Sequence, residues 1–345
     1  MKEYIIEFSA KAVTALKQIN SLENSISQTL FVIKDQTMIG TLTDGDIRRG
    51  LLNGLDTSSP IMSFMNTNFK SIYQNHTDLD EITKCRENNI KLLPILDKYD
   101  RIIDLIDLTK SLTKLPITAV LMAGGLGSRL SPLTDNTPKP MLLVGDKPIL
   151  EHNIDRLIKF GIKEFIISVQ YLKDQIIDYF GDGSQKGITI NYIIEDKPLG
   201  TIGALSLIHE VSNYTILLMN SDILTDMDFE FMYRQHLKLG KKMTVLSIPY
   251  RIDIPYAVME TDDENVLNFK EKPSLNYYTN GGVYLLDADL VSEIPKNSFY
   301  NATDLMEKLL MKKELVHYSH KGFWLDIGKP KDYKQSQDLI SKLKL

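Results

Sequence analysis

The chain has 345 residues, of which 43% are hydrophobic and 25% charged, and its formal net charge is −5. This composition predicts a globular protein, and the length predicts two or three folding units because one core rarely serves more than about 300 residues. A negative chain without a basic block is not expected to bind nucleic acid or anionic membranes. Cys85 is the single cysteine, which excludes intrachain disulfides and disfavours a cysteine-based metal site.

The N-terminus carries Glu3 and Glu7 and has no long apolar core, so it does not match a secretory signal peptide. No run approaches the roughly 18 apolar residues that a membrane-spanning helix needs. We therefore expect a cytoplasmic protein with no membrane partner.

Two stretches near the N-terminus, 29–47 and 91–108, follow one pattern: strand, polar turn, strand and helix start. Helical patterns precede them, at Val13, Leu16 and Ile19 and at Leu79, Ile82, Cys85 and Arg86. Asp46 and Asp107 occupy equivalent places, 61 residues apart. Units this small bury their strands poorly alone, so the two halves are expected to pack together.

The first stretch contains IGTLTDGDIRR, and residues 1–113 resemble a tandem pair of cystathionine-β-synthase-type (CBS) modules. The second stretch, IIDLIDL, lacks the glycine and the threonines of that pattern. The resemblance implies an adenine nucleotide as regulatory ligand, with its ribose held by Thr43 and Asp46 and with Asp107 as the equivalent position. Two alternatives stay open: Asp46 only caps a helix, or the pair serves only in dimerisation.

A polar stretch at 109–116 follows, and the linker is placed at 114–116. The predicted domains are the CBS modules, at about 1–57 and 58–113, and a larger domain at 117–345. Strands of the larger domain are predicted at 117–122, 164–169, 188–194, 215–219, 243–249 and 281–286, and helices at 149–160, 173–180, 202–212, 228–239, 303–313 and 330–343. This alternation predicts an α/β domain with a mostly parallel, doubly wound sheet beside a smaller α+β unit. Its ligand site is expected at the carboxyl ends of the strands.

Residues 119–141, AVLMAGGLGSRLSPLTDNTPKPM, carry the most informative pattern. The apolar run ends in three glycines, Gly124, Gly125 and Gly127. Backbone N–H groups in such a loop can approach an anion closely, and Arg129 and Lys139 add two cations. A triphosphate requires this combination, although the pattern is neither a P-loop nor a dinucleotide fingerprint.

The same pattern, G-G-x-G-S-R-L-x-P-L-T followed by P-K-P-M, closely resembles the signature of sugar-1-phosphate nucleotidyltransferases. The resemblance implies a Rossmann-like, glycosyltransferase-A-like domain that transfers a nucleoside monophosphate from an NTP to a sugar 1-phosphate and releases pyrophosphate. It implies that Arg129 binds the β- and γ-phosphates and Lys139 the α/β region. The nucleotide-binding residues that it implies are Met122, Ala123, Gly124, Gly125, Gly127, Ser128, Glu195, Pro198, Gly200 and Thr201.

The segment EDKPLGT, which begins at Glu195, is expected to grip the base. Thymidylyl- and uridylyl-transferring members commonly have glutamine there, whereas an ionised glutamate only accepts hydrogen bonds and suits N1–H and N2–H₂ of guanine. The segment also resembles that of mannose- and heptose-type guanylyltransferases, so GTP is favoured. A solvent-facing Glu195 and thymidylyl, uridylyl or cytidylyl transfer remain alternatives.

Two carboxylates stand beside apolar segments: Asp222 follows the run at 215–218, and Asp326 follows Phe323 to Leu325. Two carboxylates with phosphate oxygens and waters suit Mg²⁺, which prefers hard oxygen ligands. Both match metal-binding positions of the resembled family, so Mg²⁺ is the expected cofactor. The alternative for Asp222 alone is a helix N-cap.

FKEKP at 269–273 would read as solvated surface by itself, but it matches a sugar-binding pattern of the resembled family. That resemblance implies that Lys272 contacts and aligns the sugar phosphate and that Glu271 binds sugar hydroxyls. Asn280 and Gly281 complete the implied sugar site. Trp324 is interpreted as core rather than as a sugar-stacking face.

The sequence thus predicts a CBS-regulated, homo-oligomeric sugar-1-phosphate nucleotidyltransferase. The catalytic residues that the resemblance implies are Arg129, Lys139, Asp222, Lys272 and Asp326. The fused architecture also resembles guanylyltransferases that make GDP-glucosamine for legionaminic-acid-type pathways, which implies a role in cell-surface glycan or nonulosonate biosynthesis. A non-catalytic nucleotide sensor is the alternative from another class, and the intact catalytic set disfavours it.

Overall fold

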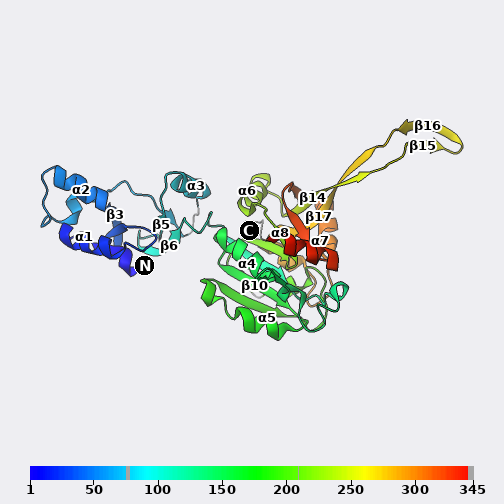
Figure 1. Cartoon of the computed structure of the whole chain (residues 1–345), viewed down its shortest axis with the longest axis horizontal. Helices are drawn as coiled ribbons and strands as arrows, with labels where there is room; N and C mark the ends of the chain where they lie inside the picture. Colours follow the sequence, from blue (N-terminus) through cyan, green and yellow to red (C-terminus); the bar gives the residue numbers. More distant parts are fainter. Residues whose placement is uncertain (75–77, 209, 341–345) are drawn as a thin grey trace. The chain divides into compact units, whose positions relative to one another are not determined.

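The computed structural model describes residues 1–74, 78–208 and 210–340. The chain divides into two compact units, Met1–Leu115 with Lys159–Gly161, and Pro116–Ile158 with Ile162–Leu345 (Figure 1). Within the described ranges, no helix is both long and apolar enough to cross a membrane. The division of the first 113 residues into two modules stays a prediction.

The first unit contains two three-stranded sheets of the same design. In each sheet the first strand is parallel to the second, and the second is antiparallel to the third. The first half comprises η1 (Lys2–Tyr4), β1 (Ile5–Glu7), α1 (Ala12–Ser21), β2 (Thr29–Lys34), β3 (Thr37–Thr43) and α2 (Asp44–Leu52). The second half comprises η2 (Ile61–Ser63), β4 (Ile72–Tyr73), α3 (Leu79–Glu87), β5 (Leu92–Leu96) and β6 (Ile102–Asp107).

One apolar core joins the two halves of this unit. Leu30 and Phe31 of β2 share a buried cluster with Leu92 and Leu96 of β5. The expectation that the halves pack together is therefore confirmed, and the physical reason is that neither small sheet can cover its own apolar face.

Two details of the predicted pattern in this unit are wrong. Helix α1 buries Ala12, Ala15 and Ile19, so Val13 lies outside the buried stripe and is 39% exposed. No helix follows β6 in the described chain, because the carboxylate of Asp107 accepts a hydrogen bond from the backbone N–H of Thr109 and closes a turn.

The second unit is built on a seven-stranded sheet of order β11-β10-β7-β12-β17-β14-β18. Its strands are β7 (Ile117–Met122), β10 (Glu164–Val169), β11 (Thr189–Ile194), β12 (Thr215–Asn220), β14 (Met243–Asp253), β17 (Ser274–Asp287) and β18 (Leu315–Ser319). Only β17 runs against the common strand direction in this described sheet. The expected α/β domain with a parallel-rich sheet is confirmed.

Helices and short strand pairs surround this sheet. The α-helices are α4 (Ile149–Lys159), α5 (Lys173–Phe180), α6 (Phe229–Leu239), α7 (Ala302–Lys312) and α8 (Pro330–Ile340). The 3₁₀ turns are η3 (Ser128–Leu130), η4 (Lys139–Met141), η5 (Ser184–Lys186), η6 (Gly203–Leu207) and η7 (Ala288–Glu293). The remaining strands are β8 (Leu143–Val144), β9 (Lys147–Pro148), β13 (Ile223–Thr225), β15 (Val258–Asp262), β16 (Asn265–Lys270) and β19 (Trp324–Asp326).

The predicted helix at 202–212 is wrong in extent and type, since the chain forms only the short 3₁₀ turn η6 there. The backbone N–H groups of Ile202 and Gly203 each donate to the carbonyl of Tyr300 at 3.1 Å. This tertiary pairing ties down the start of the segment, and Ile208 is already extended. Residue 209 and the end of the predicted helix 330–343 lie outside the described residues.

The central strands are covered on both faces. Ile216 and Leu218 of β12 pack in one cluster with Leu305 and Leu309 of α7. Leu217, which points to the opposite face because side chains alternate along a strand, is also fully buried. Burial on both sides explains why the strands of this sheet read as continuous apolar runs.

Beyond the sheet, β14 and β17 continue as a two-stranded arm, residues 249–279, which ends in the β15–β16 hairpin (Figure 1). The paired register runs from Ser247 opposite Asn280 to Asp253 opposite Ser274. The predicted strands 243–249 and 281–286 include only the buried parts of β14 and β17, because the continuous run of apolar residues ends where the arm leaves the core.

The fully buried Leu217 provides a test of the two-sided core. Leu217→Ala is expected to lower the free energy of unfolding of the second unit by about 2–5 kcal/mol, since it leaves a cavity in a packed sheet. Leu237→Ala removes an equal side chain that is 55% exposed on α6, and it is expected to change stability by less than about 0.5 kcal/mol. Trp324, the single tryptophan, reports this unit by fluorescence in urea. Equal shifts for the two variants would contradict the burial.

Candidate active site

The glycine loop lies at the carboxyl end of β7, where a parallel sheet is expected to place its ligand site. Gly127 has φ +65, and a Cβ at this position would lie 3.0 Å from Cβ of Lys139, so both conformation and space favour glycine. The N–H of Ala123 donates to the carbonyl of Ser168 at 2.8 Å and ties the loop to β10. A cavity of about 290 Å³ opens here, lined by Gly125, Leu126, Gly127, Ser128, Arg129, Leu130, Lys139, Asp222 and Gly328.

Two cations face this cavity in different ways. Lys139 is buried and its ammonium group forms an ion pair with the carboxylate of Asp222. Arg129 is exposed at the rim, and a Cβ on Gly328 would lie 3.7 Å from its Nη1. The loop therefore combines open backbone groups, one fixed cation and one solvated cation, which suits a polyphosphate.

Asp222 and Asp326 lie side by side, because β13 pairs with β19 so that Ile223 is opposite Asp326. The N–H of Ile327 also donates to the carbonyl of Asp222 at 3.0 Å. Each carboxylate has a buried Oδ1 with no hydrogen-bond partner among the residues that the structure describes. Burial, followed by the nearby charge of Asp222, raises the pKa of Asp326.

These unpartnered oxygens fit a divalent cation. A buried carboxylate oxygen without a donor is costly, and a hard cation such as Mg²⁺ would satisfy both groups. In the described ranges no group of three or more His, Cys, Asp and Glu side chains could hold a metal ion. A cation at Asp222 and Asp326 would therefore complete its coordination with substrate oxygens and water.

A second cavity of about 310 Å³ adjoins the first and contains the segment predicted to bind the base. It is lined by Met122, Gly124, Gly125, Gln170, Glu195, Pro198, Leu199, Gly200, Thr201, Asn220, Asp222 and Phe299. Glu195 is only 7% exposed, which excludes the solvent-facing alternative. Its carboxylate accepts hydrogen bonds from the hydroxyl of Ser168 and, at 3.1 Å, from the N–H of Leu199. A Cβ at Gly124 would lie 2.9 Å from Oε1 of Glu195, so the glycine lets the carboxylate approach the loop.

Gln170 and Phe299 line this second cavity, and the sequence patterns did not mark either residue. Gln170 directly follows β10, so the rule that places sites at the carboxyl ends of strands could have identified it. Phe299 precedes α7, and no sequence signal points to it.

A third cavity of about 240 Å³ lies at the root of the arm and is lined by Asn220, Ile223, Asn280, Gly281, Gly282, Tyr284, Trp324 and Asp326. The amide of Asn280 donates to the hydroxyl of Tyr284 at 2.9 Å, and its carbonyl accepts from the N–H of Gly282. The indole of Trp324 donates to the carbonyl of Gly281 at 2.9 Å. Trp324, interpreted from the sequence as core, is half-buried and forms part of this wall.

The three cavities form a continuous cleft along the carboxyl edge of the sheet. The first two share Gly125 and Asp222, and the last two share Asn220. Most residues predicted for the nucleotide, the metal and the sugar line this cleft. Glu271 and Lys272 do not, because both lie exposed in the arm. Their roles stay predictions.

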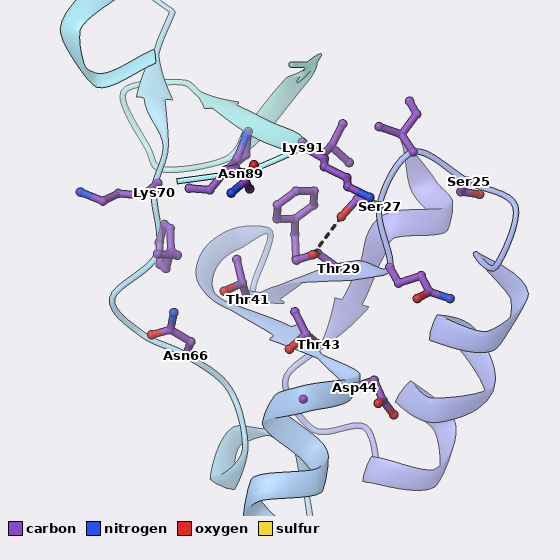
Figure 2. Close-up of a pocket in the computed structure, with 18 of the residues that line it drawn as sticks. Ser25, Ser27, Thr29, Thr41, Thr43, Asp44, Asn66, Lys70, Asn89 and Lys91 are labelled. Carbon is purple, nitrogen blue, oxygen red and sulfur yellow. Dashed lines mark hydrogen bonds between the residues drawn. The ribbon is translucent and has the colours of Figure 1, made fainter. Parts of the chain in front are cut away.

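The first unit has a separate cavity of about 580 Å³ between its two halves. Figure 2 shows Thr29 of β2, Thr41 and Thr43 of β3, and Asn89 and Lys91 at the entry to β5. Hydroxyl, amide and ammonium groups thus converge on one cavity.

Of the three residues predicted to hold the regulatory ligand, Thr43 alone is among those that line this cavity. The carboxylate of Asp46 accepts a hydrogen bond from the backbone N–H of Thr43 at 2.8 Å, and this bond is part of a capping box at the start of α2. The same carboxylate forms an ion pair with Arg49. The carboxylate of Asp107 accepts from the N–H of Thr109. The ligand roles of both aspartates stay predictions.

A family model described as nucleotidyl transferase matches residues 118–342, which include the complete cleft. The chain belongs to the nucleotidyl transferase family. The match begins at the second residue of β7. It contains none of the residues Met1–Leu115 that make up most of the first unit, and it includes the short segment Lys159–Gly161.

Several named proteins are similar to about two thirds of this chain. Mannose-1-phosphate guanyltransferase beta-A of Xenopus laevis is 31% identical over 223 residues, and the chain spans only 62% of that relative's length and matches it over 62% of its own. D-glycero-alpha-D-manno-heptose 1-phosphate guanylyltransferase of Aneurinibacillus thermoaerophilus is 32% identical over 225 residues, which are 64% of this chain and 96% of that protein. The crystal structure of HddC from Yersinia pseudotuberculosis is 26% identical with a TM-score of 0.51, and the match covers 65% of this chain and 99% of that one.

The raised pKa of Asp326 predicts a pH dependence of stability. A carboxyl group whose pKa is higher in the folded than in the unfolded chain favours folding below its unfolded pKa, and this contribution is lost as the pH rises through the folded pKa. In chelator, Asp326→Asn is therefore expected to unfold at higher urea than the wild type at neutral pH. The difference should shrink towards pH 3, at which the Asp326 carboxyl is mostly protonated in the unfolded chain, since an unperturbed aspartate has a pKa of about 3.9, and is also protonated in the folded chain, where its pKa is raised. Asp338→Asn, an exposed position on α8, serves as the control, and equal behaviour of both variants would contradict the assignment.

Proposed function

We propose that the second unit is a sugar-1-phosphate guanylyltransferase, which transfers GMP from GTP to a sugar 1-phosphate and releases pyrophosphate. The observation that carries this proposal is the continuous cleft, in which a glycine loop with Arg129 and Lys139 adjoins a cavity that contains the buried Glu195. The names of the relatives, which are guanylyltransferases for mannose 1-phosphate and a heptose 1-phosphate, support the same reaction.

In the proposed reaction, an oxygen of the sugar phosphate attacks the α-phosphorus of GTP in line. The new O–P bond forms as the bond from the α-phosphorus to the bridging oxygen breaks, and that oxygen leaves with pyrophosphate. No protein nucleophile takes part. The chain contributes by holding two anions together and by neutralising charge, with the glycine loop, Arg129 and Lys139 on the triphosphate.

Asp222 and Asp326 would hold Mg²⁺, consistent with their buried oxygens without donors. The ion, when bound, supplies positive charge that offsets the charge of the phosphates. Lys139 orients the carboxylate of Asp222 through their ion pair and stands at the wall of the triphosphate cavity. The same lysine thus connects the proposed metal site with the proposed phosphate site.

The preference for guanine follows from the hydrogen bonds that Glu195 can still accept. Ser168 and Leu199 use one acceptor site on each oxygen, and a carboxylate oxygen has two. The remaining sites suit the adjacent N1–H and N2–H₂ donors of guanine, whereas thymine, uracil and adenine lack this pair. We place the product among the nucleotide sugars of cell-surface glycan or nonulosonate biosynthesis, as the sequence resemblance implies.

The experiment that tests this function is a pyrophosphate-release assay of the full chain with Mg²⁺, using five nucleotides against a panel of sugar 1-phosphates. GTP is expected to give the highest kcat/KM, above dTTP, UTP, CTP and ATP. Glu195→Gln should weaken the use of GTP and relax discrimination, because an amide replaces one acceptor with a donor. Lys139→Ala should lower turnover at least about a hundredfold, the scale of losing one strong electrostatic contact. A wild-type preference for a pyrimidine nucleotide would overturn the guanylyl assignment alone.

We further propose that the first unit is the CBS pair and that its cavity binds an adenine nucleotide. Lys91, Thr41 and Asn66 line the cavity, as does the ring of Phe69. An ammonium group suits phosphate, hydroxyl and amide groups suit ribose and base edges, and an aromatic ring can stack on adenine. The fit of these groups to one mononucleotide supports the proposal.

Isothermal titration of the full chain with ATP, ADP and AMP tests this second site. Thr41→Val, which removes a hydroxyl from the wall of the cavity, is expected to weaken binding by about tenfold, the scale of one lost hydrogen bond. Thr37→Val on the same strand lies outside the lining and should bind normally. If none of the three nucleotides gives a heat of binding, the proposal that the first unit binds an adenine nucleotide is wrong.

A further inference from the structure

The arm leaves the second unit at the edge where the cleft lies. Its paired strands begin at Ser247 opposite Asn280, and Asn280 is itself part of the wall of the third cavity. From there the antiparallel pairing continues to Asp253 opposite Ser274, so the strands lead away from the sheet rather than back over it (Figure 1). The arm thus starts at the proposed sugar site and ends outside it.

The stem of the arm has an apolar face that nothing in the described chain covers. Tyr250 is opposite Tyr277, and Ile252 is opposite Leu275, two residues farther along. Because side chains alternate along a strand, these four share one face, and they are 40% to 57% exposed. The other face carries Arg251, which pairs with Asp253 at 2.7 Å, and near the sheet it carries Tyr278, which is 60% exposed.

The outer hairpin repeats this arrangement. Met259 is opposite Phe269, and these two side chains are 62% and 66% exposed. Leu267, which lies at an irregularity in this pairing, is 69% exposed. On the opposite face, Lys270 pairs with Glu260 at 3.0 Å. A two-stranded ribbon is marginally stable by itself, and exposed apolar side chains that gather along such a ribbon are typical of a surface that another surface covers.

The cleft lacks a cation for its second substrate. A sugar 1-phosphate is an anion, yet the second and third cavities have no lysine or arginine among their described lining residues. The cations of the first cavity are Arg129 and Lys139, and Lys139 is already paired with Asp222. This step of the argument rests on the proposed function.

The arm carries a cation that is free to serve such a phosphate. Lys272 lies between β16 and β17, is exposed, and has neither an ion pair nor a hydrogen bond in the described part of the chain. Lys270, by contrast, is neutralised by Glu260. Lys272 cannot reach the cleft of its own chain while the β14–β17 pairing persists, because that pairing carries it outward.

We propose that two copies of this chain exchange arms, so that the apolar face of each arm packs on the second copy and Lys272 enters the partner's cleft to bind the sugar phosphate. Each copy has one arm and one incomplete cleft, so a two-fold axis satisfies both at once and closes the assembly.

The mass of the full chain in solution tests the exchange without any activity measurement. Size-exclusion chromatography with light scattering is expected to give twice the mass of one chain. The double variant Tyr250→Ser with Tyr277→Ser should shift it to a monomer, because it removes an opposed pair from the apolar face. Arg251→Ala with Asn276→Ala changes an opposed pair on the other face and should stay dimeric. A monomeric mass for the wild-type chain overturns the proposal, because the arm would then fold onto its own chain or be free for another protein.

Mixed dimers test whether Lys272 acts on the partner. Lys272→Ala and Asp222→Asn are each expected to lower turnover at least about a hundredfold, since each removes one electrostatic contact. Co-expressed with different tags, the two chains should recover about a quarter of wild-type activity, because half of the dimers are mixed and each mixed dimer has one complete site. Lys139→Ala with Asp222→Asn places both defects in the cleft and should recover nothing.

The outcomes separate the exchange from the proposed reaction. Lys272→Arg should keep most of the turnover that Lys272→Ala loses, because it retains the positive charge. Lys270→Ala should keep turnover near the wild-type value. An active wild-type dimer whose mixed chains recover no activity overturns the exchange and leaves the guanylyltransferase proposal standing. If the wild-type protein is inactive with every substrate, the proposed guanylyltransferase reaction is wrong. The mass measurements then still test whether two copies exchange arms.

Discussion

The ion pair between Lys139 and Asp222 connects the parts of the cleft. Lys139 follows the glycine loop, and Asp222 follows the central strand β12, so the pair joins two segments that are 83 residues apart. A buried pair contributes little net stability, because desolvation offsets much of the attraction, but losing one partner leaves a buried charge. The pair therefore ties the loop after β7 to the carboxylate after β12, which are the two segments that the proposed triphosphate and metal sites need together.

The cleft depends on small residues as much as on charges. Glu195 can lie against the loop only because Gly124 has no side chain, and Gly127 adopts a backbone conformation that also brings Lys139 close. Asp222 and Asp326 keep buried oxygens that no donor of the described residues contacts, an arrangement that is unfavourable for stability and favourable for a cation. Local instability at these carboxylates is thus consistent with a ligand that supplies the missing contacts.

Two further features of the chain do not belong to this cleft. The cavity of the first unit gathers threonine, asparagine and lysine side chains at the contact between two similar small sheets. The arm presents an apolar face on its stem, and at the end of two strands of the central sheet it carries Lys272, which has no ion pair within the described ranges. A regulatory ligand for the first and a second copy for the other would each supply a partner that the single chain lacks.

The sequence by itself determined the elements whose signal is local. The strands at 117–122 and 164–169 have the predicted bounds, because burial on both faces requires continuous apolar runs. The glycine loop and the segment that begins at Glu195 could also be located from sequence, since loop chemistry and strand ends are encoded by neighbouring residues. The burial of Glu195 stayed open until the fold was known. The duplicated order of strands in the first unit was visible for the same reason.

Only the tertiary structure decided features that depend on distant partners. The segment at 202–212 has a helical pattern, but the carbonyl of Tyr300 binds its first N–H groups and leaves only a 3₁₀ turn. Gln170 lines the second cavity because the sheet order brings β10 beside β7. Glu271 and Lys272 have the residue types of a sugar site, yet pairing between β14 and β17 carries them outward, since strand pairing is a non-local interaction that no neighbouring residue specifies.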